Sequence, residues 1–555
     1  MHARTLARRG IPAQLSWRSP RRCRRRSCID RGARRRDERR LVTEPCDVAI
    51  VGYGPVGQTL AILLGQRGRS VVVLEKQPAA YPLPRAVHFD DEVARILQAA
   101  GVGAELPRLT EPALVYEWRN AAGETLLRIG RGGMGLSGWP DSSMFSQPDL
   151  ERVLDARAQA LPTVRVRRGC EVVDLRSDST GIELAVARAD GHRETVRARW
   201  VVGCDGANSF VRPYLGATVT DLGFFFDWLI VDLVPFERRV WDPLNWQLCD
   251  PARPTTVVSG GPGRRRWEFM RLPGESLADL NTEATAWRLL RPWGFDPGNA
   301  TLERHAVYTF QARWVDRWRA GRLLLAGDAA HQMPPFAGQG MCSGLRDAAN
   351  LAWKLDLVLA EQASDAILDT YASERIPQVR QVIDFSIELG KVICVADPAE
   401  AAARDAAMTA AARETGLTPP LPTPAIGRGL LAEGDPLAGR LVVQGVVRRG
   451  QALGRFDDVV GGGFVLLSAA GDPTRRLPAP LAAFFASVGG LGAHVGPGAP
   501  VDDVEGRYAR WFAAHPVGAV LQRPDFHVFG TARDIEETPD LVAQLQRALA
   551  AGGGR

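Results

Sequence analysis

The strongest constraint on the fold of this chain lies in residues 48–75. Apolar residues 48–51 lead directly into the turn GYGPVG at 52–57, a helical apolar pattern follows, and a second apolar segment ends in Glu75. This order of a strand, a GxGxxG turn, a helix, a second strand and an acidic residue is typical of a dinucleotide-binding unit. In such a unit the glycines let the backbone approach a pyrophosphate, and the carboxylate binds ribose hydroxyls. The unit predicts an adenine dinucleotide, either NAD or FAD. The alternative is a glycine-rich turn without a ligand.

A second constraint follows the apolar run at 323–326. This run ends in Gly327 and Asp328, a proline corner stands at 334–336, and a glycine-bearing segment opens a helical pattern over 341–354. A carboxylate at the carboxyl end of a strand, close to a helix N-terminus, suits a flavin, whose ribityl chain needs an acceptor and whose reduced ring is anionic. An ordinary crossover with a capping aspartate is the alternative.

Two further segments place polar residues at the ends of predicted elements. The strand-like segment 194–202 leads through Gly203 and Cys204 to Asp205. Arg85 stands just before a predicted helix, where it could meet a phosphate or a carboxylate. Ser146 is the predicted N-cap of another helix, which leaves Gln147 able to point at a ligand.

The chain has 555 residues, which is too long for a single hydrophobic core. Aromatic, alternating segments between about 215 and 310 predict an antiparallel sheet inserted into the dinucleotide fold. The unit after 425 has a thioredoxin-like order of elements but no cysteine, which excludes thiol redox chemistry there. The predicted fold class is α/β, with a Rossmann-like FAD-binding domain, an inserted antiparallel substrate sheet and a C-terminal thioredoxin-like domain. The expected boundaries are an Arg-rich disordered extension at 1–45, the FAD-binding domain at 46–214 and 311–400, the mainly β substrate segment at 215–310, a linker at 401–424 and the C-terminal domain at 425–555.

The positive charge of the chain is concentrated at its N-terminus. The formal net charge is +6, but residues 1–40 hold fifteen arginines against three acids and so carry +12, which leaves −6 for the remainder. A nucleic-acid or membrane-surface arm, a targeting peptide and an extension without function are the possible interpretations. We favour the last, with disorder, because the segment has no apolar periodicity. Nucleic acid is therefore not an expected partner.

Composition excludes several other classes of protein. Hydrophobic residues make up 45% and charged residues 24% of the chain, as in soluble globular proteins, and no apolar run is long enough to cross a membrane. Eight cysteines are scattered without a CxxC motif or metal-ligand spacing. This pattern indicates reduced thiols in a cytoplasmic protein and predicts no metal site.

Three motifs follow predicted strands: GxGxxG with Glu75, the segment that leads to Asp205, and Gly327-Asp328 with the glycine loop. Taken in this order, they resemble those of the group A flavoprotein aromatic hydroxylases. These are single-component FAD monooxygenases that include p-hydroxybenzoate and phenol hydroxylases. The resemblance covers about residues 46–400, and the cysteine-free C-terminal unit is similar to that of phenol hydroxylases. Segments 84–90, 267–275 and 334–340 look most like those of 3-(3-hydroxyphenyl)propionate hydroxylases, which also accept 3-hydroxycinnamate.

The resemblance implies a role for each motif residue. The glycines of the GxGxxG turn would hold the FAD pyrophosphate, Glu75 the adenosine ribose and Arg85 the pyrophosphate charge. Gln147 would contact the ribityl or ring region, Asp205 would serve FAD and pyridine-nucleotide handling, and Asp328 would bind the ribityl hydroxyls. Backbone N–H groups over 338–341 would stabilise the reduced ring. The full implied cofactor set is Gly52, Gly54, Gly57, Glu75, Arg85, Gln147, Asp205, Gly327, Asp328, Pro335, Gly338, Gly340 and Met341.

The resemblance also implies the chemistry. NADH or NADPH would reduce tightly bound FAD, O₂ would be activated as a C4a-hydroperoxyflavin, and the ring of a phenolic acid would be hydroxylated to a 2,3-dihydroxy product in aromatic catabolism. A base that deprotonates the phenol is expected, and His88 is the first candidate because its unperturbed pKa of about 6.5 suits the task. Tyr308 and His331 are weaker candidates. A homodimer is possible.

Three other functions are compatible with the residues. The chain could hydroxylate another phenol or a polyketide-like aromatic. It could be a flavoprotein that binds nucleic acid through its basic arm, or a flavin reductase that is not an oxygenase. Substrate-dependent O₂ consumption separates the last of these from a hydroxylase.

Overall fold

The computed structural model describes residues 45–80, 82–130, 133–223, 226–415 and 425–551. These residues belong to one compact unit. The predicted disorder of 1–45 falls almost entirely outside the described residues. Among the described residues, no helix is both long and apolar enough to span a bilayer.

The dinucleotide-binding sheet is built on parallel strands, as predicted. Its core strands run in the order β20-β11-β1-β2-β8, and each neighbouring pair in this run is parallel. Both β1 and β2 are almost continuously apolar and buried, as expected of strands covered on both faces. The strands of this sheet are β1 (Cys46–Val51), β2 (Val71–Glu75), β8 (Val164–Arg168), β9 (Cys170–Ser177), β10 (Ile182–Arg188), β11 (Arg193–Gly203), β19 (Arg319–Ala320) and β20 (Leu323–Leu325).

The register of this sheet brings the three sequence motifs to one edge. Val51 lies opposite both Leu74 and Gly203, and Gly203 lies opposite Leu325. The GxGxxG turn, Glu75, Asp205 and Asp328 therefore all leave the sheet at its carboxyl edge. This is where ligands bind in open α/β sheets.

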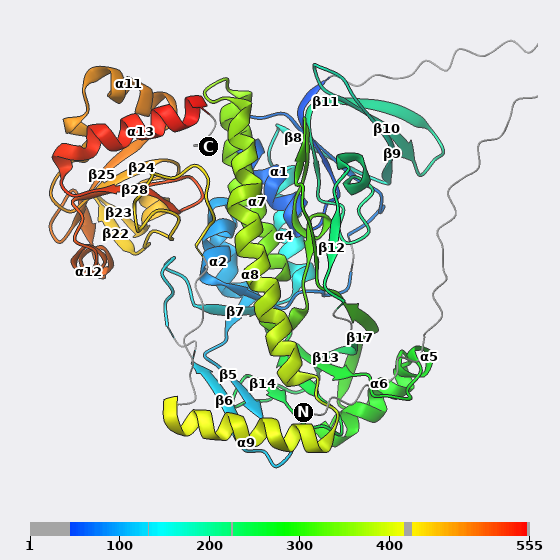
Figure 1. Cartoon of the computed structure of the whole chain (residues 1–555). Coiled ribbons are helices and arrows are strands. Elements are labelled where there is room, and N and C mark those ends of the chain that lie inside the picture. The colour runs from blue at the N-terminus through cyan, green and yellow to red at the C-terminus, as the bar shows by residue number, and fades with distance from the viewer. Residues whose placement is uncertain (1–44, 81, 131–132, 224–225, 416–424, 552–555) are drawn as a thin grey trace, which may run out of the picture. The chain divides into compact units, whose positions relative to one another are not determined.

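Helices cover this sheet and continue from its motifs (Figure 1). Helix α1 follows the GxGxxG turn and packs against α7, which follows the Asp328 turn, and α8 packs on α7 in turn. The principal helices up to α8 are α1 (Pro55–Gly65), α2 (Asp91–Ala99), α4 (Gln147–Gln159), α7 (Gly340–Leu359) and α8 (Asp369–Ile393).

The substrate sheet differs from the prediction in two respects. It runs in the order β17-β13-β16-β15-β14-β5-β6, so β5 and β6 join it from the segment expected to belong wholly to the FAD-binding domain. The pair β14/β5 is parallel, and the other pairs are antiparallel. The strands are β5 (Val115–Arg119), β6 (Thr125–Gly130), β13 (Phe226–Pro235), β14 (Asn245–Leu248), β15 (Thr255–Ser259), β16 (Arg265–Met270) and β17 (Ala300–Phe310).

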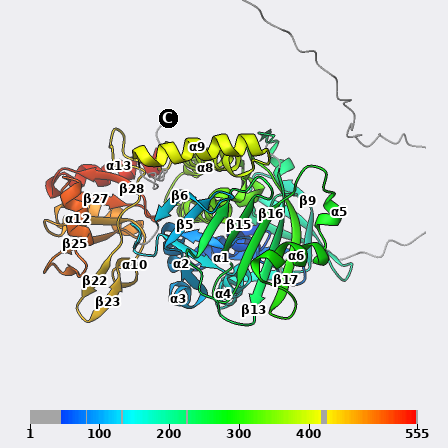
Figure 2. The same ribbon diagram turned by 90° about the horizontal axis from the view of Figure 1, so that it is seen from below.

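The Ala-rich stretch expected to be part of a linker is a helix instead. Helix α9 (Pro398–Thr415) packs on β6, and Arg404 donates to the carbonyl oxygens of Cys249 (2.5 Å) and Val392 (3.2 Å). Figure 2 shows α9 as a long helix beside β6 and α8. Only the Pro-rich residues 416–424 of the predicted linker remain, and they lie outside the described part of the chain.

The C-terminal unit holds a third sheet, in the order β23-β22-β26-β25-β24-β27-β28. One face packs on α11 and α13 and the other on α12. Buried ion pairs join this unit to the rest: Arg523 contacts Glu374 over 2.7 Å, and Arg95 contacts Asp457 over 2.7 Å. Its elements are β22 (Val446–Arg449), β23 (Ala452–Arg455), β24 (Val465–Ser468), α11 (Ala479–Ser487), β25 (Leu491–Gly496), β26 (Val501–Asp503), α12 (Arg507–Ala514), β27 (Ala519–Gln522), β28 (Val528–Ala532) and α13 (Thr538–Ala551).

Smaller elements complete the walls between the sheets. They form two three-stranded sheets and several short helices. These elements are β3 (His88–Asp90), α3 (Leu106–Leu109), β4 (Thr110–Pro112), β7 (Ser142–Phe145), β12 (Val219–Asp221), α5 (Leu277–Leu280), α6 (Glu283–Leu290), β18 (Arg313–Val315), β21 (His331–Gln332) and α10 (Phe456–Val459).

Candidate active site

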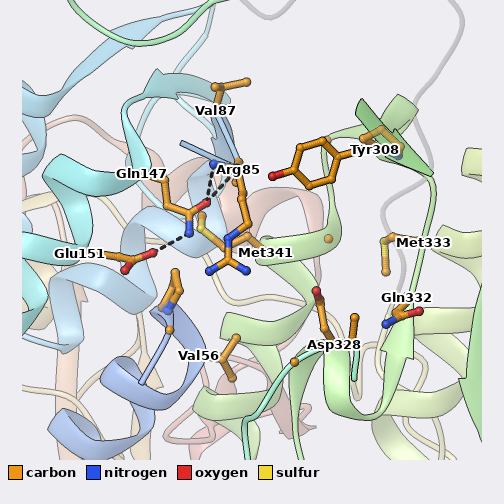
Figure 3. Close-up of a pocket in the computed structure, with 18 of the residues that line it drawn as sticks. Val56, Arg85, Val87, Gln147, Glu151, Tyr308, Asp328, Gln332, Met333 and Met341 are labelled. Carbon is orange, nitrogen blue, oxygen red and sulfur yellow. Dashed lines mark hydrogen bonds between the residues drawn. The ribbon is translucent and has the colours of Figure 1, made fainter. Parts of the chain in front are cut away.

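A cavity of about 1120 Å³ extends from the carboxyl edge of the parallel sheet to the substrate sheet. Gly54, Glu75, Asp205 and Asp328 line its first part, and Tyr308 lines its second. Figure 3 shows Asp328 and Tyr308 on the same space. The volume exceeds the range of about 300–1,000 Å³ that is usual for pockets that hold one small ligand.

The three glycines of the GxGxxG turn have different tasks. Gly52 has φ +101°, and a Cβ there would lie 2.4 Å from the carbonyl oxygen of Cys204; a Cβ on Gly57 would lie 2.2 Å from the carbonyl oxygen of Gly52. These two glycines are required by packing. A Cβ on Gly54 would meet no protein atom within 4 Å, and Gly54 lines the cavity. The open space for a phosphate is therefore at Gly54.

Glu75 lies where a ribose ligand is expected. Its Oε2 accepts a hydrogen bond from the N–H of Tyr53 (2.8 Å), and its Oε1 accepts one from the N–H of Gln77 (2.8 Å). Each carboxylate oxygen has a second lone pair, so two hydroxyl groups could still be accepted. The contact with Tyr53 also fixes the acid against the glycine turn.

Arg85 and Gln147 meet at the cavity, but Gln147 has a structural task. Its Oε1 accepts from the N–H groups of Arg85 (3.2 Å) and Ala86 (2.7 Å), and its Nε2 donates to Glu151 over 2.5 Å. Figure 3 shows the Arg85 guanidinium beside Gln147 and Met341. Gln147 thus positions Arg85, and its predicted flavin contact stays a prediction. Glu151, which the sequence did not single out, is a carboxyl whose pKa burial raises.

The carboxylate of Asp205 is used within its own turn. Oδ1 accepts from the hydroxyl of Ser209 (2.6 Å), and Oδ2 accepts from the N–H groups of Phe210 (2.7 Å) and Val211 (3.0 Å). Asp205 lines the cavity while it caps this turn. Its first role is to fix the turn that follows β11.

Asp328 faces the cavity and is held by a buried support. The N–H of Gly327 donates to Asp347 Oδ2 over 2.9 Å, and Asp347 also pairs with His331 (2.7 Å) and Arg375 (2.8 Å). Burial raises the pKa of Asp328, although His331 and Arg85 act in the opposite direction. Gly327 is absent from the cavity wall, so its predicted cofactor contact is indirect. His331 pairs with Asp347 through Nε2, and its Nδ1 has no hydrogen-bond partner among the described residues, so His331 stays a candidate proton acceptor.

The loop before α7 is held by His88 and a charged network. Nδ1 of His88 lies 3.3 Å from the carbonyl oxygen of Gly338, whose φ of +64° suits glycine. Arg346 pairs with Asp90 (2.6 Å) and bonds to Gln339 (2.8 Å). This network could not be found from the sequence, because its members come from separate segments.

The amides predicted to face the flavin need one correction. The N–H of Gly338 donates to the carbonyl oxygen of Pro335 over 2.8 Å, so it is already used within the loop. Helix α7 begins at Gly340, and the first N–H groups of a helix have no acceptor within the helix. The amides of Gly340 and Met341 are therefore the ones available to an anion. Pro335, Gly338, Gly340 and Met341 all line the cavity.

Comparison with known families decides the identity of this site. Residues 45–386 match the family of the FAD binding domain, and residues 439–548 match the HcaD C-terminal domain. A probable NADH-specific resorcinol 4-hydroxylase of Rhodococcus jostii is 42% identical over 511 residues, with 91% of this chain and 95% of that protein covered. The chain belongs to the FAD-dependent aromatic hydroxylases.

Other relatives of this flavoprotein hydroxylase act on different aromatics. A 3-(3-hydroxyphenyl)propionate/3-hydroxycinnamic acid hydroxylase of Klebsiella pneumoniae is 34% identical over 547 residues, which cover 92% of this chain and 96% of that protein. The anhydrotetracycline hydroxylase OxyS of Streptomyces rimosus superposes with a TM-score of 0.70 at 25% identity, over 92% of this chain and all of that one. The flavin-dependent monooxygenase PieE, solved with FAD and substrate, superposes with a TM-score of 0.77 at 24% identity, over 91% and 99% of the two chains.

The residues of the hydroxylase fit FAD. Gly54 leaves space for a phosphate, Glu75 offers acceptors to a ribose, and Asp328 offers acceptors to the ribityl chain. Gln332 lies beside Asp328 (Figure 3), and both polar atoms of its side chain are buried without a hydrogen-bond partner among the described residues. A polyhydroxylated ligand would satisfy these atoms.

Replacing Asp328 tests this fit directly. Asp328→Ala will raise the dissociation constant for FAD about 10- to 100-fold, because it removes charge-assisted hydrogen bonds to the ribityl hydroxyls. The measurement is titration of apoprotein with FAD. Asp369→Ala, an exposed acid at the start of α8, is the matched control and should leave affinity unchanged. FAD affinity of Asp328→Ala equal to that of the wild type would contradict the assignment.

Proposed function

We propose that this hydroxylase uses FAD, NADH and O₂ to hydroxylate a phenol that carries a second substituent at the meta position. The observation that carries the proposal is the continuous cavity, which links the residues that fit FAD to an aromatic and polar chamber on the substrate sheet. The Rhodococcus jostii relative is named a probable resorcinol 4-hydroxylase, and the Klebsiella pneumoniae relative is named for 3-(3-hydroxyphenyl)propionate. Both compounds are meta-substituted phenols, and the first relative is described as NADH-specific.

The chain provides an aromatic wall for such a ring. Phe336 of the proline corner packs against Trp228 and Phe310 of the substrate sheet, with ring centroids 5.7 and 5.6 Å apart. Phe336 and Phe310 line the cavity together with Tyr308. Bound FAD would supply the redox and oxygen chemistry, while these side chains orient the phenol and exclude water.

His88 remains the first candidate for the proton acceptor. A carbonyl oxygen only accepts hydrogen bonds, so the contact with Gly338 assigns the hydrogen to Nδ1 and leaves Nε2 as the nitrogen that can take a proton. His88 lines the cavity beside Pro335 and Gly338. Removal of the phenolic proton makes the ring more nucleophilic and thus favours oxygen transfer.

Replacing His88 should change the pH profile of hydroxylation. His88→Ala will lower kcat about a hundredfold. It will also remove the fall of kcat/KM at acid pH that protonation of the base would cause in the wild type. The measurement is product formation from pH 5.5 to 9, and exposed His192 provides the control His192→Ala. Full hydroxylation by His88→Ala with an unchanged pH profile would exclude His88 as the base.

Turnover of defined phenols tests the proposed function itself. Resorcinol and 3-(3-hydroxyphenyl)propionate should stimulate NADH oxidation and O₂ uptake, with products heavier by one oxygen atom in mass spectrometry. NADH oxidation that needs neither a phenol nor O₂ would instead identify a flavin reductase. Salt-sensitive DNA binding lost on deletion of residues 1–40, without phenol turnover, would favour the nucleic-acid alternative.

The finer architecture is also proposed. The C-terminal sheet has β24 and β25 parallel, with β27 and β28 antiparallel beside them and helices on both faces, which supports a thioredoxin-like fold. Residues 425–555 contain no cysteine, which excludes thiol redox chemistry in this unit. The homodimer and the cytoplasmic location stay predictions.

A further inference from the structure

A row of charged side chains crosses the cavity face of the substrate sheet. Asp232 on β13 lies directly opposite Arg266 on β16 and Arg304 on β17. Glu268 is two residues beyond Arg266 on β16 and therefore points to the same face. We call Asp232, Arg266, Glu268 and Arg304 the charged row. Arg266, Glu268 and Arg304 line the cavity.

The two arginines of the charged row both lie against Asp232. Arg266 donates to both oxygens of Asp232 (2.7 and 3.0 Å) and to the carbonyl oxygens of Arg85 (2.7 Å) and Pro84 (2.9 Å). Arg304 lies 3.7 Å from Asp232, with its guanidinium 4.6 Å from the centre of the Tyr308 ring. These contacts hold the sheet against the segment that carries Arg85 and His88.

Accessibility separates Glu268 from the rest of the charged row. The side chains of Arg266, Arg304 and Asp232 are 3%, 1% and 3% exposed, whereas that of Glu268 is 14% exposed. Among the described residues its carboxyl accepts no hydrogen bond, and its ion-pair contact with Arg266 is 3.7 Å long. The neighbouring Thr256 hydroxyl donates to Gln247 instead, over 2.5 Å. A partly buried carboxyl without a donor has hydrogen-bonding capacity left for a ligand.

We infer that Glu268 accepts a hydrogen bond from the meta substituent of the phenol and so selects a neutral, hydroxyl-bearing substituent over a carboxylate. This inference rests on the proposed function. Arg266 and Arg304 also line the cavity, but they are almost fully enclosed and lie against Asp232, whereas Glu268 is the most exposed member of the charged row. An anionic substituent placed beside Glu268 would be repelled. Arg85, a further cation of the cavity, lies beside Gln147 and Met341 on the cofactor side (Figure 3).

The electrostatics of Glu268 support this role. Burial raises the pKa of its carboxyl, and Asp232 acts in the same direction, while Arg266 and Arg304 oppose the shift. A carboxyl with a raised pKa is a stronger acceptor for a phenolic O–H. His88 and Glu268 would then each receive one hydroxyl of a 1,3-dihydroxyarene. Between them the ring would present a carbon ortho to one hydroxyl for oxygen transfer.

Ligand titration of the holoenzyme tests the inference. The flavin absorbance change reports the dissociation constants of resorcinol and 3-(3-hydroxyphenyl)propionate for the wild type and Glu268→Gln. We expect Glu268→Gln to bind resorcinol about tenfold more weakly and the phenylpropionate more tightly, because the negative charge is lost. Glu303→Gln is the matched control, since Glu303 pairs with Arg264 on the same sheet and does not line the cavity.

A wild-type ligand series gives a test that needs no substitution. Resorcinol should bind about tenfold more tightly than 3-methoxyphenol, in which the donor hydroxyl is methylated. Equal affinity for these two ligands, or an unchanged resorcinol-to-phenylpropionate ratio in Glu268→Gln, would overturn the role of Glu268. Failure of the wild type to hydroxylate either phenol would instead overturn the proposed function, so the two failures are distinguishable.

Discussion

Gly52→Ala will prevent accumulation of folded flavoprotein, whereas Gly54→Ala will give a folded protein that binds FAD weakly. The two glycines lie two residues apart in the same turn and differ in what surrounds them. A Cβ on Gly52 would lie 2.4 Å from the carbonyl oxygen of Cys204 and 2.8 Å from Cα of Asp205, and both are backbone atoms. A Cβ on Gly54 would project into the cavity, where no protein atom lies within 4 Å.

The expected size of the Gly52 effect follows from two terms. A side chain at φ +101° costs of the order of 1–3 kcal/mol. Overpacking against strand ends that cannot separate costs about 1–3 kcal/mol more. Together these approach the total stability of many domains, about 5–15 kcal/mol. Soluble expression, circular dichroism and bound flavin measure the outcome.

The Gly54 substitution is the internal comparison for Gly52→Ala. The φ of Gly54 is −76°, which alanine adopts without strain. The unfolding free energy of Gly54→Ala should therefore stay close to that of the wild type. The added methyl would occupy space meant for the pyrophosphate and should weaken FAD binding about tenfold or more. Normal FAD content in Gly54→Ala, or normal folding of Gly52→Ala, would refute the division of roles between the two glycines.

The carboxyl edge of the parallel sheet could be predicted from the sequence because the motifs that form it are local. The apolar end of each of β1, β2, β11 and β20 is followed within two residues by a glycine or an acid, and parallel strands bring such ends to one edge. The substrate chamber could not be predicted in this way. The pairing of Asp232 with Arg266 and Arg304 depends on cross-strand register, and β5 joins β14 from more than a hundred residues away.

The differences between the predicted and the observed structure also have specific causes. Helix α9 was mistaken for a linker because most of its residues are exposed, so it lacks the apolar stripe by which an amphipathic helix is identified. Gln147 was expected to face a ligand because it follows a helix N-cap. It lines the cavity, but its acceptor oxygen is used by the amides of Arg85 and Ala86, and its contact with a ligand stays a prediction. A free polar side chain cannot be told from a satisfied one in sequence alone.

Asp347→Asn is expected to be the most destabilising conservative change near the site. Asp347 on α7 is fully buried and accepts from Gly327, His331 and Arg375. Asparagine keeps the shape but loses the charge, which leaves the Arg375 guanidinium buried without a carboxylate. Removing one partner of a buried pair costs about 3–5 kcal/mol, as measured by urea unfolding. Asp356→Asn on the same helix breaks a partly buried pair with Arg69, in which both side chains still reach solvent, and should cost less, about 1 kcal/mol.

The pH dependence of stability gives the same prediction a second signature. Burial alone would raise the pKa of Asp347, but His331 and Arg375 hold it below its usual value. The stabilisation that depends on a depressed carboxyl pKa is complete above the unfolded value of about 3.9 and is lost as pH falls toward the folded value. The wild type should therefore lose more stability than Asp347→Asn between about pH 5 and pH 3. Parallel acid profiles for the two proteins would show that Asp347 does not carry this charge. The Gly327 turn that presents Asp328 would then need another support.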